Sequence, residues 1–313
     1  MKIVVTGGAG FIGSHVVDAY LKAGHEVTVI DDFSTGKREN LGNEGRVGLT
    51  VREGDIRDLD FLKSVMTQVR PDVVSHHAAQ VSVAISSMRP LDDLTLNVLG
   101  TVNILEAVRT ESPQSKVIYS ASGGTMYGVA ETLPTLEDTP ASPTSPYGLS
   151  KYTAERYVWL YADIYGLRAT VLRYGNVYGP RQDPHGEVGV CAIFTERMLH
   201  SQPVTVFGDG TPLRDYIFVS DVAAANTAAL REGDGEAFNI GTGRGTSTNE
   251  VFRTLSGATG YVLEARYEPL RPGELMAVSL SVEKAASNLD WSPQVDFTEG
   301  VRQTVEWYRQ YRS

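Results

Sequence analysis

The sequence predicts an α/β fold in which a doubly wound parallel sheet precedes a smaller C-terminal lobe. Apolar, strand-like runs alternate with stretches of helical periodicity up to about residue 175, which is typical of βαβ units. A glycine-rich loop joins the first strand to the first helix. After Tyr174, turn residues crowd the segment 175–189 and the apolar runs become shorter, which indicates a second lobe of different construction.

The glycine-rich loop reads Thr6-Gly7-Gly8-Ala9-Gly10-Phe11-Ile12-Gly13, and it follows the apolar run 3–5. Glycines in this context permit a tight turn, close approach of the backbone to a pyrophosphate, and close helix–strand packing. The N–H groups at the start of the following helix suit phosphate oxygens. A second apolar run ends in Asp31-Asp32, roughly 20 residues after the loop, where a ribose-binding carboxylate is expected. The pattern predicts a Rossmann-type dinucleotide site; a glycine-rich turn in another α/β protein is the weaker alternative.

The remaining elements follow in order along the chain. Strands are expected at residues 49–51, 73–79, 116–120 and 169–173, and helices at residues 59–69, 91–108 and 146–165. The first of these helices stops before Pro71, because a residue that precedes proline disfavours the helical conformation. Shorter strands are expected at 204–207 and 215–219, and the run 237–240 is expected to return to the first sheet. These boundaries predict a dinucleotide-binding domain of residues 1–175 plus about 216–244, and a second domain of about 176–215 plus 245–313.

The composition is that of a folded protein. With 42% hydrophobic residues among 313, the chain can bury a sizeable core. A net charge of −10 argues against general binding to nucleic acid or to a membrane surface. The single cysteine, Cys191, excludes a disulfide within the chain. The chain starts on a strand without a signal peptide, and no apolar run approaches about 18 residues, so we expect a soluble cytoplasmic protein.

The six histidines predict no metal site. His76 and His77 are adjacent on an expected strand and should point to opposite faces of the sheet. No histidine or cysteine pair in the sequence has the spacing typical of zinc ligands.

A tyrosine and a lysine lie four positions apart in the segment Tyr147-Gly148-Leu149-Ser150-Lys151, so on a helix they share one face. An ammonium group near a phenol stabilises the phenolate and lowers the pKa of the tyrosine. Tyr147 could then act as an acid or base near neutral pH. Taken alone, the pair has an ordinary alternative, which is a surface contact without chemistry.

Several motifs occur in one order along nearly the whole chain. They are TGGAGFIG at 6–13, HHAAQ at 76–80, SASGGTMYG at 120–128, PYGLSK at 146–151, LRYGNVYGPRQ at 172–182, GDGTPLRDYIFVSDVA at 208–223 and RPGE at 271–274. Together they resemble the extended short-chain dehydrogenase/reductase family, and within it the nucleotide-sugar epimerases of the UDP-glucose 4-epimerase type. The resemblance implies a Rossmann-type domain for NAD and a smaller C-terminal substrate-binding lobe.

The resemblance implies a set of NAD-binding residues in the first lobe. They are Gly7, Gly10, Phe11, Ile12 and Gly13 at the phosphates, Asp31 and Asp32 at the adenosine ribose, Asp55 and Ile56 at the adenine, Ala78, Ala79 and Gln80 along the cofactor with Asn97 supporting the nearby backbone, and Tyr147, Lys151 and Tyr174 at the nicotinamide end. A carboxylate at Asp31 would repel a 2′-phosphate, so NAD is expected rather than NADP. For Ala78 and Ala79, plain core packing is the alternative.

The substrate-binding residues implied by the resemblance lie mostly in the second lobe. They are Asn176, Arg214 and Arg271 at the diphosphate, Thr205 and Phe207 at the uracil, Glu274 at the second ribose, and Val278 at the 2-substituent of the hexose. A local ion pair between Arg214 and Asp215 is the alternative for that arginine. Ser122 is the first candidate, and Thr125 the second, for the hydroxyl that bonds the reacting sugar oxygen. Related dehydratases and decarboxylases carry an acid just before the Val-Tyr-Gly of this motif, where this chain has Gly124-Thr125-Met126.

The implied activity is 4-epimerisation of a UDP-hexose through a 4-keto intermediate, with Tyr147 as the base. The alternatives are another nucleotide-sugar enzyme of the family (UDP-uronate epimerase, dehydratase, decarboxylase or reductase) or a non-catalytic NAD-binding protein. Family members pair through two helices, here about 94–108 and 150–165, so a homodimer is expected. The second helix carries Tyr152, Tyr157, Trp159 and Tyr161, which we expect to contribute apolar surface to that interface.

Overall fold

The core of the computed structural model, which describes residues 1–42, 45–185, 189–270 and 273–311, is a seven-stranded parallel sheet. Its order is β11-β6-β5-β4-β1-β2-β3. The strands are β1 (Lys2–Thr6), β2 (Glu26–Asp31), β3 (Leu49–Glu53), β4 (Val73–His76), β5 (Lys116–Ser122), β6 (Ala169–Tyr174) and β11 (Glu236–Ile240). The chain runs outward from β1 to β3 and then crosses to β4 on the other side of β1, which confirms the doubly wound prediction. This reversal creates a crevice at the carboxyl ends of β1 and β4, where such folds bind ligands.

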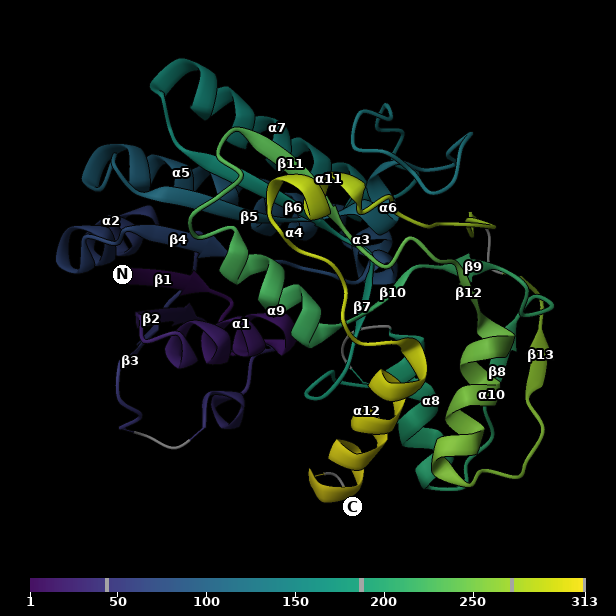
Figure 1. Ribbon diagram of the computed structural model, residues 1–313. Helices are drawn as coiled ribbons and strands as arrows, with labels where there is room; N and C mark the ends of the chain where they lie inside the picture. The colour runs from purple at the N-terminus through teal and green to yellow at the C-terminus, as the bar shows by residue number, and fades with distance from the viewer. Residues whose placement is uncertain (43–44, 186–188, 271–272, 312–313) are drawn as a thin grey trace.

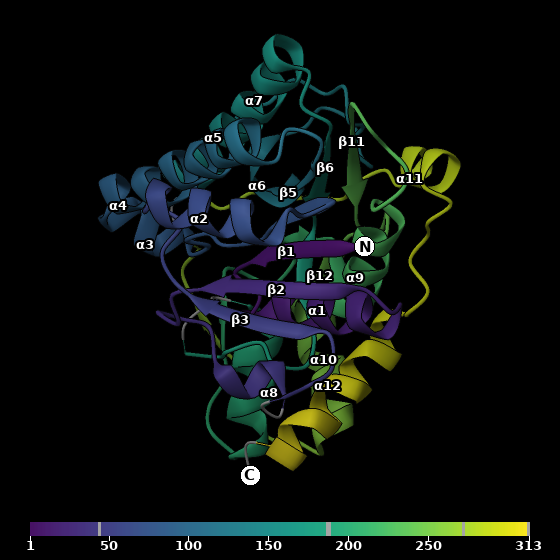
Figure 2. The ribbon, with the colours of Figure 1, turned by 90° about the vertical axis from the view of Figure 1, so that its left-hand side faces the viewer.

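Helices cover both faces of the sheet (Figures 1 and 2). One face carries α1 (Phe11–Lys22), α9 (Val219–Ala228) and α11 (Glu283–Asn288), and the other carries α2 (Leu59–Val69), α5 (Gly100–Glu111) and α7 (Pro146–Tyr165). The sheet's alternating side chains split between two cores: Val5 packs towards α1, whereas Val4 packs towards α2 and α5. Both strand faces are therefore apolar, as a buried parallel sheet requires.

Two predicted helices have the predicted bounds, because local signals mark both of their ends. Asp58 caps α2 by accepting a hydrogen bond from the N–H of Phe61. Ser145 caps α7 in the same way, and Pro146 occupies its first turn. Gly166 ends α7 in the left-handed conformation.

The segment 91–108 is helical throughout, as predicted, but it contains a π-helical turn that the sequence analysis did not predict. It consists of the end of α4 (Pro90–Leu94), the π-helical turn η2 (Thr95–Leu99) and most of α5, and a separate short helix, α3 (Val83–Met88), precedes it. Asn97 lies in the π-helical turn, is 1% exposed, and bonds to the backbone of Gln80. π-helical turns are often found at functional sites, and this one directs an amide side chain towards the crevice loop. The predicted strand 73–79 likewise stops earlier, at His76.

The second lobe packs three helices around its own apolar core (Figure 1). The helices are α8 (Val190–Leu199), α10 (Thr248–Thr259) and α12 (Phe297–Tyr311). Short strands pair in twos: β7 (Asn176–Tyr178) with β10 (Tyr216–Phe218), β8 (Thr205–Phe207) with β13 (Arg266–Glu268), and β9 (Leu213–Arg214) with β12 (Thr246–Ser247). The remaining short elements are η1 (Arg38–Leu41) and α6 (Gly123–Met126). Cys191 is buried in this core, which agrees with a packing role.

The run 237–240 does return to the first lobe, because β11 pairs in parallel with β6. The domain boundaries near residues 175, 215 and 244 stay a prediction. Across the described ranges, no helix has both the length and the apolar character needed to cross a membrane.

Candidate active site

The glycine loop is shaped so tightly that side chains cannot be added at two of its positions. Gly7 has a φ of +67°, and a Cβ there would lie 2.6 Å from the backbone nitrogen of Ala78. A Cβ on Gly13 would lie 2.1 Å from the carbonyl oxygen of Gly7. Gly10 precedes α1 without a side-chain cap, so the N–H groups of the first helical turn remain available to an anion. This cradle fits the pyrophosphate of a dinucleotide.

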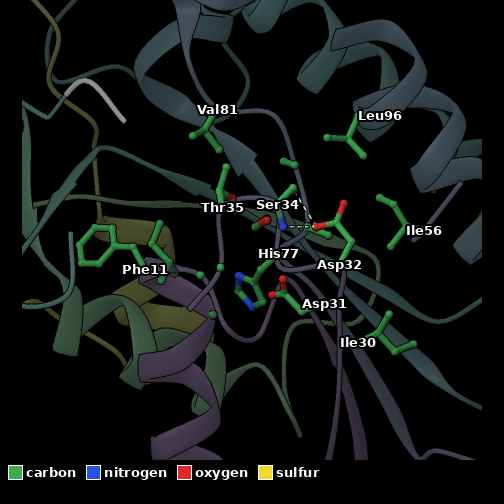
Figure 3. A pocket seen from close by; sticks show the side chains of 18 of the residues that line it. Phe11, Ile30, Asp31, Asp32, Ser34, Thr35, Ile56, His77, Val81 and Leu96 are labelled. Carbon is green, nitrogen blue, oxygen red and sulfur yellow. Dashed lines mark hydrogen bonds between the residues drawn. The ribbon is translucent and has the colours of Figure 1, made fainter. Parts of the chain in front are cut away.

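A single pocket extends from this loop along the carboxyl ends of the strands (Figure 3). The sequence-predicted residues that line it are Gly7, Gly10, Phe11, Ile12, Gly13, Asp31, Asp32, Asp55, Ile56, Ala78, Ala79, Tyr147, Lys151 and Tyr174. Figure 3 shows Phe11 on one side of the pocket and Ile56 and Leu96 on the other. The residues come from segments far apart in the chain, and the fold brings them to one crevice.

Asp31 lies at the end of β2 and is 7% exposed. Its Oδ2 accepts a hydrogen bond from the N–H of Ala9 (2.9 Å) and its Oδ1 one from the N–H of Phe33 (2.9 Å). Burial raises the pKa of Asp31, and these two hydrogen bonds oppose the rise. The carboxylate thus braces the glycine loop while its edge faces the pocket.

Gln80 and Asn97 do not line the pocket, but hydrogen bonds between them support a segment of its wall. The N–H of Gln80 donates to Asn97 Oδ1 (2.8 Å), and Asn97 Nδ2 donates to the carbonyl of Gln80 (2.9 Å). The Gln80 side chain turns to Asp93 Oδ1 (2.9 Å). The amide of Asn97 thereby fixes the backbone directly after Ala79, and Ala79 itself lines the pocket.

Tyr147 and Lys151 both line the pocket from the first turns of α7. Lys151 is 4% exposed, and its Nζ lies 4.6 Å from the centroid of the Tyr119 ring. Burial lowers the pKa of Lys151 to about 7, against the opposing charges of Asp93 and Glu155. A lysine whose pKa lies near neutral pH is therefore placed one helical turn from Tyr147.

The two candidate hydroxyls lie together at the end of β5. Thr125 Oγ1 donates to Ser122 Oγ (2.9 Å), which leaves the proton of Ser122 to serve another acceptor. Ser122 directly follows Ser120 and Ala121, which line the pocket. Between the candidates, a Cβ on Gly123 would lie 2.7 Å from the buried Leu280 side chain, which accounts for glycine at that position.

A second cavity lies in the C-terminal lobe. Its wall includes five predicted substrate residues, namely Asn176, Thr205, Phe207, Arg214 and Glu274. Arg214 Nη2 pairs with Glu274 Oε1 at 2.6 Å. Asp215 is instead fully buried and accepts from Thr242, Gly243 and Leu280, so the alternative of a local Arg214–Asp215 ion pair is wrong.

Val278 is not among the described residues that line either cavity. Arg271 lies outside the described residues. Val278 is 6% exposed, and its N–H donates to the carbonyl of Leu213 (3.0 Å), beside the strand that carries Arg214.

The two adjacent histidines have separate environments. His76 is bonded through both ring nitrogens, to Thr6 (2.7 Å) and Thr101 (3.0 Å). His77 bonds to Ser75 (2.9 Å) and lines the pocket. Burial lowers the pKa of both rings, that of His77 to about 3, so both are neutral. Among the residues that the structure describes, no cluster of His, Cys, Asp and Glu suits a metal ion.

Sequence reasoning missed several residues of the pocket wall. They are Ser34, Thr35, Gly36, His77, Val81, Leu96, Ser120 and Ala121. The signal for the first three is their position just after β2, at the carboxyl end of a strand that flanks the crevice. His77 carries a similar signal, since it directly follows β4.

The model of the NAD dependent epimerase/dehydratase family matches residues 3–241, which include the glycine loop, Tyr147, Lys151 and Arg214. The chain belongs to this family. It is 43% identical over 311 residues to a UDP-glucose 4-epimerase of Mycolicibacterium smegmatis, covering 99% of both chains. A UDP-glucose 4-epimerase of Thermotoga maritima, solved with UDP-glucose, is 47% identical with a TM-score of 0.96 over 100% of both chains. One of Thermus thermophilus, solved with NAD, is 44% identical with a TM-score of 0.93 over 99% of this chain and 100% of its own.

The environment of Asp31 predicts which dinucleotide the family fold holds here. Two basic residues that follow Asp31 in the sequence are engaged elsewhere: Lys37 pairs with Asp183 (3.0 Å), and Arg38 pairs with Glu53 and covers the Phe33 ring. A 2′-phosphate would therefore meet the Asp31 carboxylate without a cation directed at it. We expect acid extracts of the purified protein to contain NAD or NADH, measured by enzymatic cycling. Extracts that contain only NADP(H) would contradict this assignment.

Proposed function

We propose that the protein catalyses the NAD-dependent 4-epimerisation of a UDP-hexose, with UDP-glucose and UDP-galactose as the first substrate pair. The single observation that carries the proposal is the composite site. A dinucleotide pocket holds the Tyr147–Lys151 pair, and a separate cavity presents Arg214 and Glu274. The full-length similarity to enzymes named UDP-glucose 4-epimerase supports the choice of reaction. Fold alone would not support it, because one fold serves many reactions.

The proposed reaction needs a base, a cation beside it and a grip on the nucleotide. NAD in the first pocket would supply the redox chemistry, by accepting hydride from C4 of the sugar and returning it to the opposite face. The Tyr147 phenolate removes the proton of the 4′-hydroxyl and later gives it back. The Lys151 ammonium stabilises that phenolate, and Ser122 donates a hydrogen bond to the reacting oxygen.

The diphosphate must stay bound while the keto sugar turns over. Arg214 suits this role, because a guanidinium presents paired donors to phosphate oxygens and stays charged at any working pH. In the structure Glu274 pairs with that guanidinium. We infer that Glu274 passes to the ribose hydroxyls when the diphosphate takes its place, and that Asn176 and Arg271 complete the phosphate site.

The test is incubation of the purified protein with UDP-glucose, UDP-galactose, UDP-N-acetylglucosamine and UDP-glucuronate, with products separated by anion-exchange chromatography. The proposal expects the 4-epimer of at least the plain hexose, without added cofactor. Loss of water, loss of carbon dioxide or net release of NADH would each identify one of the alternative reactions instead. No conversion of any substrate would favour the non-catalytic alternative.

The resemblance to the family places Val278 at the 2-substituent of the hexose, and we propose that its small side chain leaves the sugar site wide. Valine lacks the tyrosine ring that restricts some relatives of this family to glucose and galactose, and its neighbours Ala277 and Ser279 are also small. We expect the wild type to epimerise UDP-N-acetylglucosamine as well as UDP-glucose. Val278→Tyr should lower the rate with the N-acetyl sugar several-fold more than the rate with UDP-glucose. The plain sugar is the internal control, and an unchanged ratio between the two rates would contradict the prediction.

We also propose a homodimer that forms through the face of α4, η2 and α7. Leu94, Leu99, Leu149 and Leu160 are each between 45% and 54% exposed on these contacting elements, and exposed apolar surface of this kind often marks an interaction site. The aromatic part of the expectation needs correction: Tyr161 is buried and bonds to Glu106, and only Tyr157 is classed as exposed. Light scattering at micromolar concentration should give twice the 34.0 kDa chain mass, and Leu160→Glu should give the monomer. A monomeric wild type would contradict the dimer.

The cytoplasmic location stays a prediction, to be tested by cell fractionation.

A further inference from the structure

A buried carboxylate lies behind the catalytic helix. Asp93, on α4, is 0% exposed. Its Oδ1 accepts hydrogen bonds from Gln80 Nε2 (2.9 Å) and Asn97 Nδ2 (3.1 Å), and its Oδ2 is buried without a hydrogen-bond partner among the described residues. Burial raises the pKa of Asp93, and hydrogen bonding from Ser150 and Gln80 and the charge of Lys151 oppose the rise. Burying a carboxylate is costly unless a positive charge lies nearby.

The same cluster reaches the helix that carries the proposed base. Asn97 Nδ2 also lies 3.1 Å from Ser150 Oγ, and Ser150 Oγ donates to the carbonyl of Tyr147 (3.0 Å). Ser150 directly precedes Lys151 on α7, and the Lys151 side chain is 4% exposed. Asp93 and Lys151 are thus both buried, on the contacting helices α4 and α7, and the charge of each favours the ionised form of the other.

The other acidic group near Lys151 already has a cationic partner. Glu155, one turn further along α7, forms a buried ion pair with Arg173 (2.5 Å). His76 and His77 face Lys151 as neutral rings, and burial raises the pKa of Tyr119, so its phenol stays protonated. On α4 itself, Asp92 pairs with Arg89 at the exposed surface. The titratable groups that face Lys151 or Asp93 are therefore Tyr119, Tyr147, His76, His77 and Glu155.

We propose that Asp93 is a positioning residue for the 4-epimerisation, whose buried negative charge keeps Lys151 in the ammonium form that the Tyr147 phenolate requires. This inference rests on the proposed function only for its link to turnover. The electrostatic link between Asp93 and Lys151 is a property of the chain itself.

The charge of Asp93 also decides how the Tyr147–Lys151 pair shares its protons. The active arrangement, phenolate beside ammonium, contains the same number of protons as the inactive arrangement, neutral phenol beside neutral amine. A fixed negative charge near Lys151 favours phenolate beside ammonium over neutral phenol beside neutral amine. It also retains protons on the pair as a whole, so it raises both pKa values with which the coupled pair titrates.

Asp93→Asn removes this charge with little change of shape. The amide oxygen of asparagine can accept the hydrogen bonds from Gln80 and Asn97 that Oδ1 accepts now, and its NH₂ group would take the place of the unbonded Oδ2. Asp92→Asn is the matched control, since it removes a carboxylate from the adjacent position of the same helix, where the side chain is 54% exposed. Melting temperatures of both variants would establish that they are folded.

The direct measurement is the titration of Lys151 by NMR of protein labelled at the lysine Cε, with Lys151→Met used to assign its signal. We expect the pKa of Lys151 to fall by about one pH unit or more in Asp93→Asn, as for the loss of a nearby opposite charge. It should stay unchanged in Asp92→Asn. An unchanged Lys151 pKa in folded Asp93→Asn would overturn the inference, whatever the protein's activity.

The pH dependence of turnover connects the charge to the reaction. In Asp93→Asn, both limbs of the bell-shaped profile of kcat should move to lower pH, and the maximum should fall, with KM for the UDP-sugar nearly unchanged. A purely structural role would lower the rate without moving the limbs, and that outcome would also overturn the inference. Absence of epimerisation in the wild type would contradict the proposed function, while leaving the NMR result to decide the inference about Lys151.

Discussion

Tyr147→Phe should lose nearly all 4-epimerisation while it still binds UDP with almost wild-type affinity. The substitution removes the phenolic oxygen that exchanges a proton with the 4′-hydroxyl, and general acid–base groups of this kind contribute roughly 10²–10⁴-fold to the rate. The aromatic ring remains, so the pocket wall keeps its shape. The measurements are kcat with UDP-galactose and the Kd for UDP by calorimetry.

Tyr157→Phe is the matched control, because Tyr157 lies on the same helix with 38% exposure and lines neither of the two pockets described above. It should be as active as the wild type. If Tyr147→Phe retained a substantial rate, the role of Tyr147 as the base would be wrong, even if the protein proved to be an epimerase.

Gly13→Ala should lose bound NAD and a large part of the stability of the first lobe. The added methyl group would lie 2.1 Å from the carbonyl oxygen of Gly7, and backbone cannot rotate away as a side chain can. The turn that cradles the pyrophosphate must then open. Overpacking of this kind typically costs about 1–3 kcal/mol. The measurements are the NAD content of the purified protein and its thermal unfolding with and without added NAD.

Gly257→Ala provides the same chemical change at a harmless position. Gly257 lies inside α10 with nothing within 4 Å of an added Cβ, so alanine there should raise stability by up to about 1 kcal/mol. If Gly13→Ala had the same melting temperature and the same NAD content as the wild type, the structural account of the loop would be wrong.

The helices and strands could be predicted from the sequence where local end signals and apolar periodicity agree. The Asp58 cap and Pro71 bound α2, and Ser145-Pro146 and Gly166 bound α7, so both helices could be placed within their observed limits. The short, largely apolar run 237–240 predicted the return of the chain to the sheet, because it has the composition of a buried strand.

The polar interior could not be predicted in the same way. The π-helical turn that directs Asn97 inward, and the burial of Asp93 beside it, have no periodic signature, because each depends on partners brought in from α7 and the loop after β4. The partner of Arg214 is Glu274, sixty residues away, whereas the sequence suggested its neighbour Asp215. Long-range ion pairs of this kind follow from the fold and cannot be derived from the local sequence.

The sequence predicted a larger share of the residues that line the first pocket than of those that line the second cavity, for a physical reason. A dinucleotide is held largely by backbone in a loop whose glycine spacing is visible in the sequence. The second cavity is lined by side chains from several short strands, and its register depends on pairings such as β8 with β13. A resemblance to known enzymes supplied those residues, and Arg271 among them lies outside the described part of the chain.

The central claim is that the protein inverts C4 of a UDP-hexose by removing and returning the same hydrogen. Its most direct test is incubation of the purified protein with UDP-glucose that carries deuterium at C4, followed by mass spectrometry and NMR of the products. The account predicts UDP-galactose that retains the deuterium at C4, with no hydrogen gained from solvent at that carbon. Failure to form UDP-galactose, or UDP-galactose with solvent hydrogen at C4, would contradict it.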